Sequence, residues 1–200
     1  MLLKELFHIE RNLVSNYRFI KNMLEHGLND MSITGTCFEY GLQNGSLHED
    51  METKPVTNYG LAKDCLRKFM QSMKNDYRFS FKWLRLFYLF GPGQGTKSLY
   101  SQMMNIISED NKEFNMSPGD QIRDFLSVET MAEYIVTVAL QNDIDGIINY
   151  CSGKPVSIRN FAENFFKQHN YPVKLNPGYY PYPEHEPLAF WGNTDKLKKF

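Results

Sequence analysis

Apolar residues recur every three or four positions near the start of the chain. Within residues 3–26 they are Leu6, Ile9, Leu13, Tyr17, Ile20 and Leu24. This spacing predicts a helix with one buried face, and Gly27 is its expected end. A short apolar run over residues 31–38 indicates a buried strand, and after a polar loop a second helical pattern covers residues 59–76.

The remaining pattern continues the alternation of strands and helices. A strongly apolar strand is expected over residues 79–90, ending at the sequence GPGQG. Helices are expected over 98–109, 129–141 and 157–169, and strands over 122–128 and 146–153; residues 171–190 are rich in proline and tyrosine. Strands that alternate with helices favour an α/β architecture with a largely parallel sheet.

Composition limits the class of protein. The 200 residues fit one domain, or one domain with a small appendage. With 42% hydrophobic and 14% aromatic residues, the chain can bury a sizeable core and is not typical of a disordered protein. The net charge is −1, from 22 basic and 23 acidic residues, which gives no field of one sign for nucleic acid or an anionic membrane.

Cysteine usage and the first residues indicate a compartment. Cys37, Cys65 and Cys151 are odd in number and lack paired spacing, which suits a reducing cytoplasm better than a disulfide framework. The start of the chain, MLLKELFHIERN, carries charges every few residues and has no long apolar run, unlike a signal peptide or a membrane span. No spacing of His, Cys and carboxylates predicts a metal site. We expect a soluble, cytoplasmic protein.

Three residues suggest acid/base chemistry. Tyr59 and Lys63 stand four apart at the start of a predicted helix, so they share one helical face. Thr36 ends a predicted strand, which places all three at the carboxyl edge of a parallel sheet, where such sheets bind ligands. An adjacent ammonium and a positively charged nicotinamide favour a phenolate, and a hydroxyl can orient the same substrate oxygen. Alone, however, a Tyr-x-x-x-Lys pair is common by chance.

Five segments in this order resemble the extended short-chain dehydrogenases/reductases that act on nucleotide sugars, the NAD-dependent epimerase/dehydratase family. They are TGTCFEYG (34–41), YGLAK (59–63), LRLFYLFGPGQ (84–94), IRDFLSVETMAE (122–133) and GIINYCSGKPVSI (146–158). The resemblance implies a partial Rossmann-like, doubly wound parallel sheet with a small C-terminal substrate-binding lobe. Residues 1–92 would belong to the Rossmann domain and 93–200 to a mixed substrate-binding region with one or two segments returning to the sheet.

The resemblance also implies roles for the first three residues. Tyr59 would be the general acid/base, Lys63 would tune it and contact the nicotinamide ribose, and Thr36 would orient the reacting oxygen. The implied cofactor is NAD or NADP, and the implied substrate is a nucleotide-diphosphate sugar. The helices over 3–26 and 59–76 match those that build the family's dimer interface, so a homodimer is expected.

Further along the chain, the resemblance assigns ligand contacts. Arg123 would bind the substrate diphosphate, although it can also be a surface residue paired with Asp120 or Asp124. Tyr88 stands where relatives often have an Asn that touches the sugar nucleotide. The backbone from Tyr88 to Pro92 would approach the nicotinamide carboxamide. Glu39 is open to a structural or a substrate-facing interpretation.

The chain departs from the family in three ways, one of them in the tail, where many relatives place an Arg for the diphosphate and this chain has YPYPEHEPLAFWGN (180–193). No Gly-x-x-Gly-x-x-Gly turn is present, and the spacing of GPGQG does not replace it. We interpret Met1 as lying near the family's fourth helix, with roughly the first 100 residues of the fold absent. Cys37 and Phe38 replace the Asp-Glu pair of sugar 4,6-dehydratases, so we expect no dehydration.

The predicted function is therefore a nucleotide-sugar epimerase or 4-ketoreductase, with Tyr59 as acid/base, that makes a sugar for cell-surface polysaccharide. The alternative is a truncated non-catalytic chain, or a partner subunit of a split enzyme, that uses the same fold and dimer helices.

Overall fold

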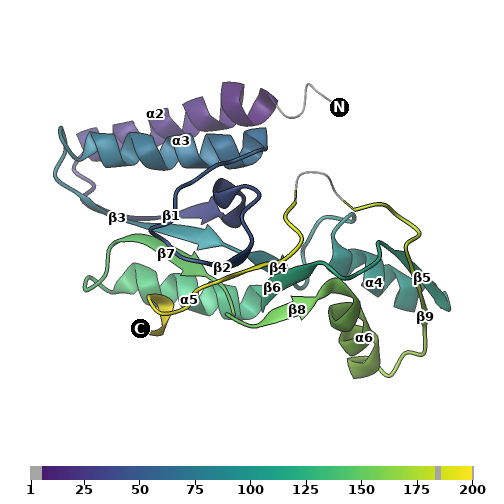
Figure 1. The fold of residues 1–200 in the computed structure, drawn as a ribbon. Coiled ribbons are helices and arrows are strands. Elements are labelled where there is room, and N and C mark those ends of the chain that lie inside the picture. The colour runs from purple at the N-terminus through teal and green to yellow at the C-terminus, as the bar shows by residue number, and fades with distance from the viewer. Residues whose placement is uncertain (1–5, 183–185, 200) are drawn as a thin grey trace.

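Three parallel strands form the centre of the computed structural model, which describes residues 6–182 and 186–199. They are β1 (Asp30–Thr36), β3 (Ser80–Leu86) and β7 (Gly146–Tyr150), in the order β1-β3-β7. Helices α2 (Val14–Glu25) and α3 (Asn58–Met73) cover one face, and α5 (Val128–Leu140) covers the other (Figure 1). This is the doubly wound parallel arrangement that the sequence predicts.

Side chains of β3 alternate between two hydrophobic cores, as a strand's period of two requires. Phe81 and Trp83 pack with residues of α2 and α3, among them Leu24, Leu66 and Met70. Leu84 packs on the opposite face with Ile148 of β7 and with Met131 and Val138 of α5. The central strand is therefore covered on both faces, and its residues 81–85 are all buried, the charged Lys82 and Arg85 included.

The helix expected over 3–26 contains a wider turn. Residues His8–Leu13 form a π-helix, η1, that runs directly into α2. Residues 1–5 lie outside the described part of the chain. The predicted end is confirmed, because α2 stops at Glu25 and Gly27 takes a φ of +91°, a backbone conformation that favours glycine.

A smaller lobe lies at one end of the central sheet (Figure 1). Strand β6 (Ile122–Ser127) pairs in parallel with β4 (Tyr88–Phe90) and antiparallel with β8 (Pro155–Ser157). Strands β5 (Glu113–Met116) and β9 (Lys174–Pro177) form a parallel pair. Helices α4 (Leu99–Ser108) and α6 (Ile158–Gln168) share a core that includes Met103, Phe114, Phe165 and Phe166. Near the sheet, β2 (Gly45–Leu47) pairs with β10 (Phe190–Gly192), and η3 covers Leu197–Lys199.

The prediction of one strand over 79–90 is wrong, because the chain changes partners at Phe87. The Phe87 N–H donates to the Tyr150 carbonyl at 3.0 Å, at the end of the pairing with β7. The next residues leave that sheet and pair with β6 as β4. The segment thus connects the central sheet to the smaller lobe, and a cavity lies where the two meet.

Candidate active site

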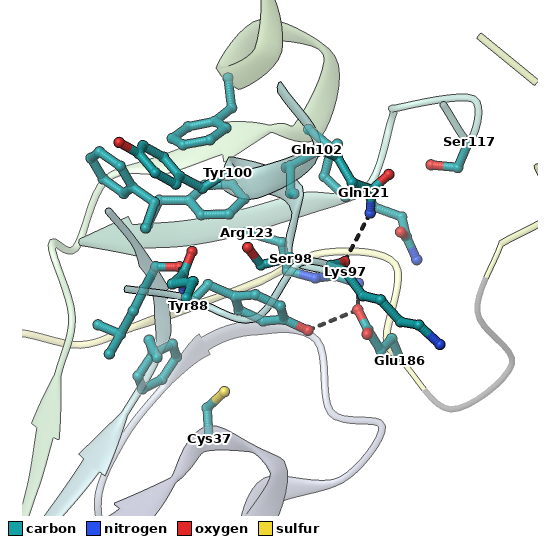
Figure 2. Close-up of a pocket in the computed structure, with 18 of the residues that line it drawn as sticks. Cys37, Tyr88, Lys97, Ser98, Tyr100, Gln102, Ser117, Gln121, Arg123 and Glu186 are labelled. Carbon is teal, nitrogen blue, oxygen red and sulfur yellow. Dashed lines mark hydrogen bonds and ion pairs between the residues drawn. The ribbon is translucent and has the colours of Figure 1, made fainter. Parts of the chain in front are cut away.

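A cavity of about 690 Å³ lies at the carboxyl ends of β1 and β3, against the smaller lobe (Figure 2). Its walls are mostly apolar and aromatic, with a few polar groups, which is typical of a small-molecule site. The lining includes Thr36, Cys37, Phe38, Tyr59, Leu86, Tyr88, Gln94, Lys97, Tyr100, Gln121, Arg123, Phe161 and Glu186.

Thr36 is held where β1 ends. It is the last residue of the strand and the N-cap of the short helix η2 (Cys37–Tyr40), and its hydroxyl accepts the Phe38 N–H at 3.3 Å. Its own N–H donates to Oε1 of Glu39 at 2.9 Å, which completes a capping box. The structure confirms that Thr36 stands at a strand end, on the wall of the cavity.

The start of α3 lies against this turn. Thr57 caps the helix by accepting the Gly60 N–H at 3.1 Å. A Cβ added to Gly60 would stand 2.6 Å from the Phe38 carbonyl oxygen, so a glycine is needed for this close approach. The approach brings Tyr59 and Thr36 to the same cavity wall.

The Tyr59 ring is half-buried between two other rings. Its centroid is 5.2 Å from that of His8 and 6.2 Å from that of Phe38. Burial raises the pKa of the Tyr59 phenol, and hydrogen bonding to Thr36 opposes that shift. The phenol therefore stays protonated at neutral pH in this structure.

The influences that shift the pKa of Tyr59 here are burial, Thr36, Cys37 and Glu39, and the tuning role of Lys63 stays a prediction. The Lys63 Nζ donates to the Thr34 carbonyl at 2.7 Å, and burial lowers the pKa of Lys63 itself. Lys63 borders a second cavity, of about 210 Å³, together with Tyr59, His8 and Asn12. Tyr59 thus faces both cavities, whereas Lys63 faces the smaller one.

The two residues expected to contact substrate meet at one carboxylate. The Tyr88 hydroxyl donates to Oε2 of Glu186 at 2.8 Å, and Nη2 of Arg123 lies 2.8 Å from the same oxygen (Figure 2). The Arg123 guanidinium lies over the Tyr88 and Phe190 rings, at 5.5 and 4.8 Å from their centroids. Burial raises the pKa of Tyr88 well above its usual range.

The surface interpretation of Arg123 is wrong, because its side chain is fully buried and pairs with Glu186. Asp124 instead accepts the N–H groups of Ser152 at 2.7 Å and Gly153 at 2.9 Å, and so stabilises the turn after β7. Pro92 is exposed and is not part of the cavity lining, although Phe90 and Gln94 on either side of it are.

Sequence reasoning missed Glu186 and His8 as neighbours of the predicted site residues. Glu186 lies in the proline-rich tail, where no periodic pattern marks it. His8 reaches Tyr59 from η1, and the sequence shows no sign of a π turn there. Both contacts join residues about 50 to 100 positions apart, and only the folded chain brings them together.

Two negative findings concern the described residues, 6–182 and 186–199. Over these ranges no helix has both the length and the hydropathy to cross a bilayer. Over the same ranges no three His, Cys, Asp or Glu side chains converge closely enough to hold a metal ion.

The sequence profile of the NAD dependent epimerase/dehydratase family matches residues 5–151. The chain is 28% identical to dTDP-6-deoxy-L-talose 4-dehydrogenase (NAD(+)) of Aggregatibacter actinomycetemcomitans over 182 residues, which are 90% of this chain and 67% of that protein. It is 26% identical to GDP-6-deoxy-D-talose 4-dehydrogenase of the same organism, over 74% of this chain and 50% of that protein.

Solved structures show the same fold at lower identity. The UDP-N-acetylglucosamine 4-epimerase of Methanobrevibacter ruminantium M1 superposes with a TM-score of 0.82 at 20% identity, over 91% of this chain and 59% of that one. The UDP-glucuronic acid 4-epimerase of Bacillus cereus, in complex with UDP-glucuronic acid and NAD, gives 0.83 at 20% identity, over 94% and 60%. The chain therefore spans about half to two thirds of the length of these relatives.

Proposed function

The chain belongs to the NAD dependent epimerase/dehydratase family, and on that premise we propose that it supplies the acid/base and substrate-binding groups of a nucleotide-sugar enzyme acting at sugar C4. The reaction is a hydride transfer, in a 4-dehydrogenase/4-ketoreductase or in a 4-epimerase. The observation that carries the proposal is that Thr36 and Tyr59 share one wall of the main cavity, with Lys63 one helical turn beyond. A role in making cell-surface polysaccharide sugars is part of the proposal.

Tyr59 is the proposed general acid/base. Because burial raises the pKa of its phenol, the protonated form is ready to donate to the oxygen at C4 when a ketone is reduced. In the oxidative direction the Tyr59 phenol would first lose its proton to solvent, and its phenolate oxygen would then take the proton of the C4 hydroxyl. Thr36, fixed at the end of β1, hydrogen-bonds the reacting oxygen and orients it.

The nicotinamide end of NAD fits the residues around the smaller cavity. Tyr59 and Lys63 both border it, and Lys63 there offers an ammonium donor for ribose hydroxyls. When bound, NAD supplies the hydride acceptor and, reduced, the hydride donor. Tyr88 and the backbone of Leu89 and Phe90, before Pro92, line the main cavity and are the proposed further contacts of the cofactor from that side.

Arg123 is the proposed contact for the substrate diphosphate. Its side chain lines the main cavity, and its Nε is buried without a hydrogen-bond partner among the described residues. A phosphate oxygen is a strong acceptor for such a guanidinium donor. Tyr88, on the same wall, is the proposed sugar-nucleotide contact.

We propose a 6-deoxy sugar as the substrate, because the cavity wall beside Thr36 is uncharged. The neighbouring residues are Cys37, Phe38 and Leu86, which offer no charge and little hydrogen-bonding capacity to a substituent at C5. A methyl group suits this surface better than a carboxylate would. The two curated relatives reported above are also named for 6-deoxy sugars.

A homodimer through the first two long helices is also part of the proposal. Large apolar side chains are exposed on them, among them Phe7, Val14 and Phe19 before or on α2, and Leu61 and Phe69 on α3. Exposed apolar groups gathered on one region are typical of a protein interface. A second copy of this chain is the proposed partner.

Product analysis tests the function. The purified chain is mixed with NAD⁺ and dTDP-6-deoxy-L-talose, and the sugar is followed by proton NMR. A 4-ketone with NADH indicates a dehydrogenase, whereas the C4 epimer without net NADH indicates an epimerase. An unchanged sugar, across dTDP, GDP and UDP substrates, would contradict the proposal and favour a non-catalytic chain.

A further inference from the structure

One carboxylate lies at the junction of the elements that carry the proposed catalytic residues. Glu39 is fully buried, and its Oε1 accepts the Thr36 N–H at 2.9 Å. The Trp83 indole N–H donates to Oε1 at 2.9 Å, and Nε of Arg85 donates to Oε2 at 2.8 Å. Arg67 adds an ion-pair contact at 3.7 Å.

These partners come from three different elements. Thr36 ends β1, Trp83 and Arg85 lie on β3, and Arg67 lies on α3, the helix that carries Tyr59 and Lys63. We propose that Glu39 is a positioning residue for the reaction, holding Thr36 in a fixed place relative to the helix of Tyr59 and Lys63. This inference rests on the proposed function of those three residues.

The backbone at Gly35 lies so close to this carboxylate that it leaves no room for a side chain. A Cβ added to Gly35 would stand 2.5 Å from Oε1 of Glu39 and 2.2 Å from the Trp83 indole nitrogen. A glycine is therefore needed directly before Thr36 for these contacts to form. Glu39 does not line the main cavity, so a substrate-facing role does not fit its position.

The charge of Glu39 also affects the pKa values of Tyr59 and Lys63. The pKa of the Tyr59 phenol depends on burial and on Thr36, Cys37 and Glu39, and the His8 ring is in edge contact with the Tyr59 ring. The Glu39 charge acts to raise the pKa of Tyr59 and that of Lys63. Removing that charge is therefore expected to lower both pKa values.

General disruption of the packing around Tyr59 and Lys63 would shift their pKa values in a different pattern. If water entered around these residues, the pKa of Tyr59 would fall, because burial is what raises it. The pKa of Lys63 would then rise, because burial is what lowers it. The direction of the Lys63 shift thus separates loss of the Glu39 charge from general disruption.

The test titrates both side chains in the full chain carrying Glu39→Gln. Tyr59 is followed by ¹⁹F NMR with 3-fluorotyrosine and assigned with Tyr59→Phe; Lys63 is followed by ¹³C NMR and assigned with Lys63→Met. We expect both pKa values to fall. Unchanged values, or a fall for Tyr59 with a rise for Lys63, would overturn the inference.

Two further variants address folding. If Glu39→Gln alone does not fold, Glu39→Gln/Arg85→Gln removes both partners of the ion pair and avoids an unpaired buried charge; the same two downward shifts are expected. Asp64→Asn is the matched control, because it removes another buried carboxylate that pairs with Arg67 but acts on neither Tyr59 nor Lys63. Asp64→Asn should leave the pKa values of Tyr59 and Lys63 unchanged.

The positioning role has a separate kinetic readout. Glu39→Asp keeps the charge but is one methylene shorter, so it pulls the carboxylate away from the Thr36 N–H. We expect kcat to fall about tenfold or more with KM unchanged, because small displacements of catalytic groups are costly. A wild-type kcat would overturn the positioning role. An active Tyr59→Phe enzyme would instead refute the proposed function, while the pKa titration would still report on Glu39.

Discussion

Oε2 of Glu186 accepts from both Nη2 of Arg123 and the Tyr88 hydroxyl, each at 2.8 Å. Glu186 is 63 positions from Arg123 and 98 positions from Tyr88 in the sequence. The two contacts therefore join the C-terminal segment to β6 and β4. The Arg123 side chain is fully buried, whereas that of Glu186 is 23% exposed. The pair therefore connects the cavity wall to the tail of the chain.

Loss of Arg123 should destabilise the fold. Arg123→Met leaves the Glu186 carboxylate without its cation, and we expect the free energy of unfolding to fall by about 3 kcal/mol. Urea unfolding measures the change. Arg159→Met is the control, since its contact with Asp120 is 4.0 Å long and exposed, and it should cost less than about 1 kcal/mol. Equal costs would contradict the importance of the buried pair.

Gly60→Ala should damage both stability and the site. The added Cβ would stand 2.6 Å from the Phe38 carbonyl, a backbone atom that cannot move without displacing the turn after Thr36. We expect a loss of about 1–3 kcal/mol in the free energy of unfolding. Gly95→Ala is matched to it, because nothing lies within 4 Å of its Cβ position. If both variants unfold at the wild-type urea midpoint, the close approach is not as described.

Stability should depend on Asp64 at low pH. Burial acts to raise the pKa of Asp64, but hydrogen bonds from Lys68 and Arg67 outweigh it, and the folded pKa is lowered. A lowered folded pKa contributes stability above the unfolded value, about 3.9, and that contribution is lost as pH falls through the folded pKa. We therefore expect Asp64→Asn to be less stable than wild type at pH 7, with the difference shrinking below about pH 4. Thermal unfolding across pH checks this, and a constant difference would count against it.

Charges on the exposed helix faces should separate the proposed dimer. Phe19 on α2 is 65% exposed and Phe69 on α3 is 44% exposed. We expect Phe19→Glu/Phe69→Glu to be monomeric by light scattering, with wild type dimeric, because buried unpaired carboxylates are costly. Leu140→Glu, at an 80% exposed position on α5, should leave the mass unchanged. A wild-type monomer at micromolar concentration would refute the dimer.

Long periodic segments were predictable from sequence. Helices α3, α4, α5 and α6 fall within three residues of their expected ranges, because each has an apolar face and begins at a Ser or Thr cap. Thr36 at a strand end followed from the same pattern. The short strands β2, β5, β8, β9 and β10 did not, because three or four residues carry no period and pair with distant partners.

The identity of the candidate site residues was easier to predict from sequence than the contacts that set their pKa values. Spacing placed Tyr59 and Lys63 on one helical face, but it did not show that the Lys63 ammonium would reach the Thr34 carbonyl. Nor did it show that Glu39 would be a buried acceptor for Trp83 and Arg85, 44 and 46 residues away. Burial and charge at one residue depend on these long-range contacts, and local sequence does not encode them.

The central claim is that Tyr59 is the acid/base of an NAD-dependent reaction at sugar C4. The most direct measurement is NADH formation, by absorbance, after the purified chain is mixed with NAD⁺ and dTDP-6-deoxy-L-talose, beside Tyr59→Phe. We predict that wild type forms NADH, or the C4 epimer by proton NMR if the reaction is an epimerisation, and that Tyr59→Phe is slower in either reaction by about 10²-fold or more, with an unchanged unfolding midpoint. Equal rates in the two proteins, or a wild type that yields neither NADH nor a C4 epimer, would contradict the claim.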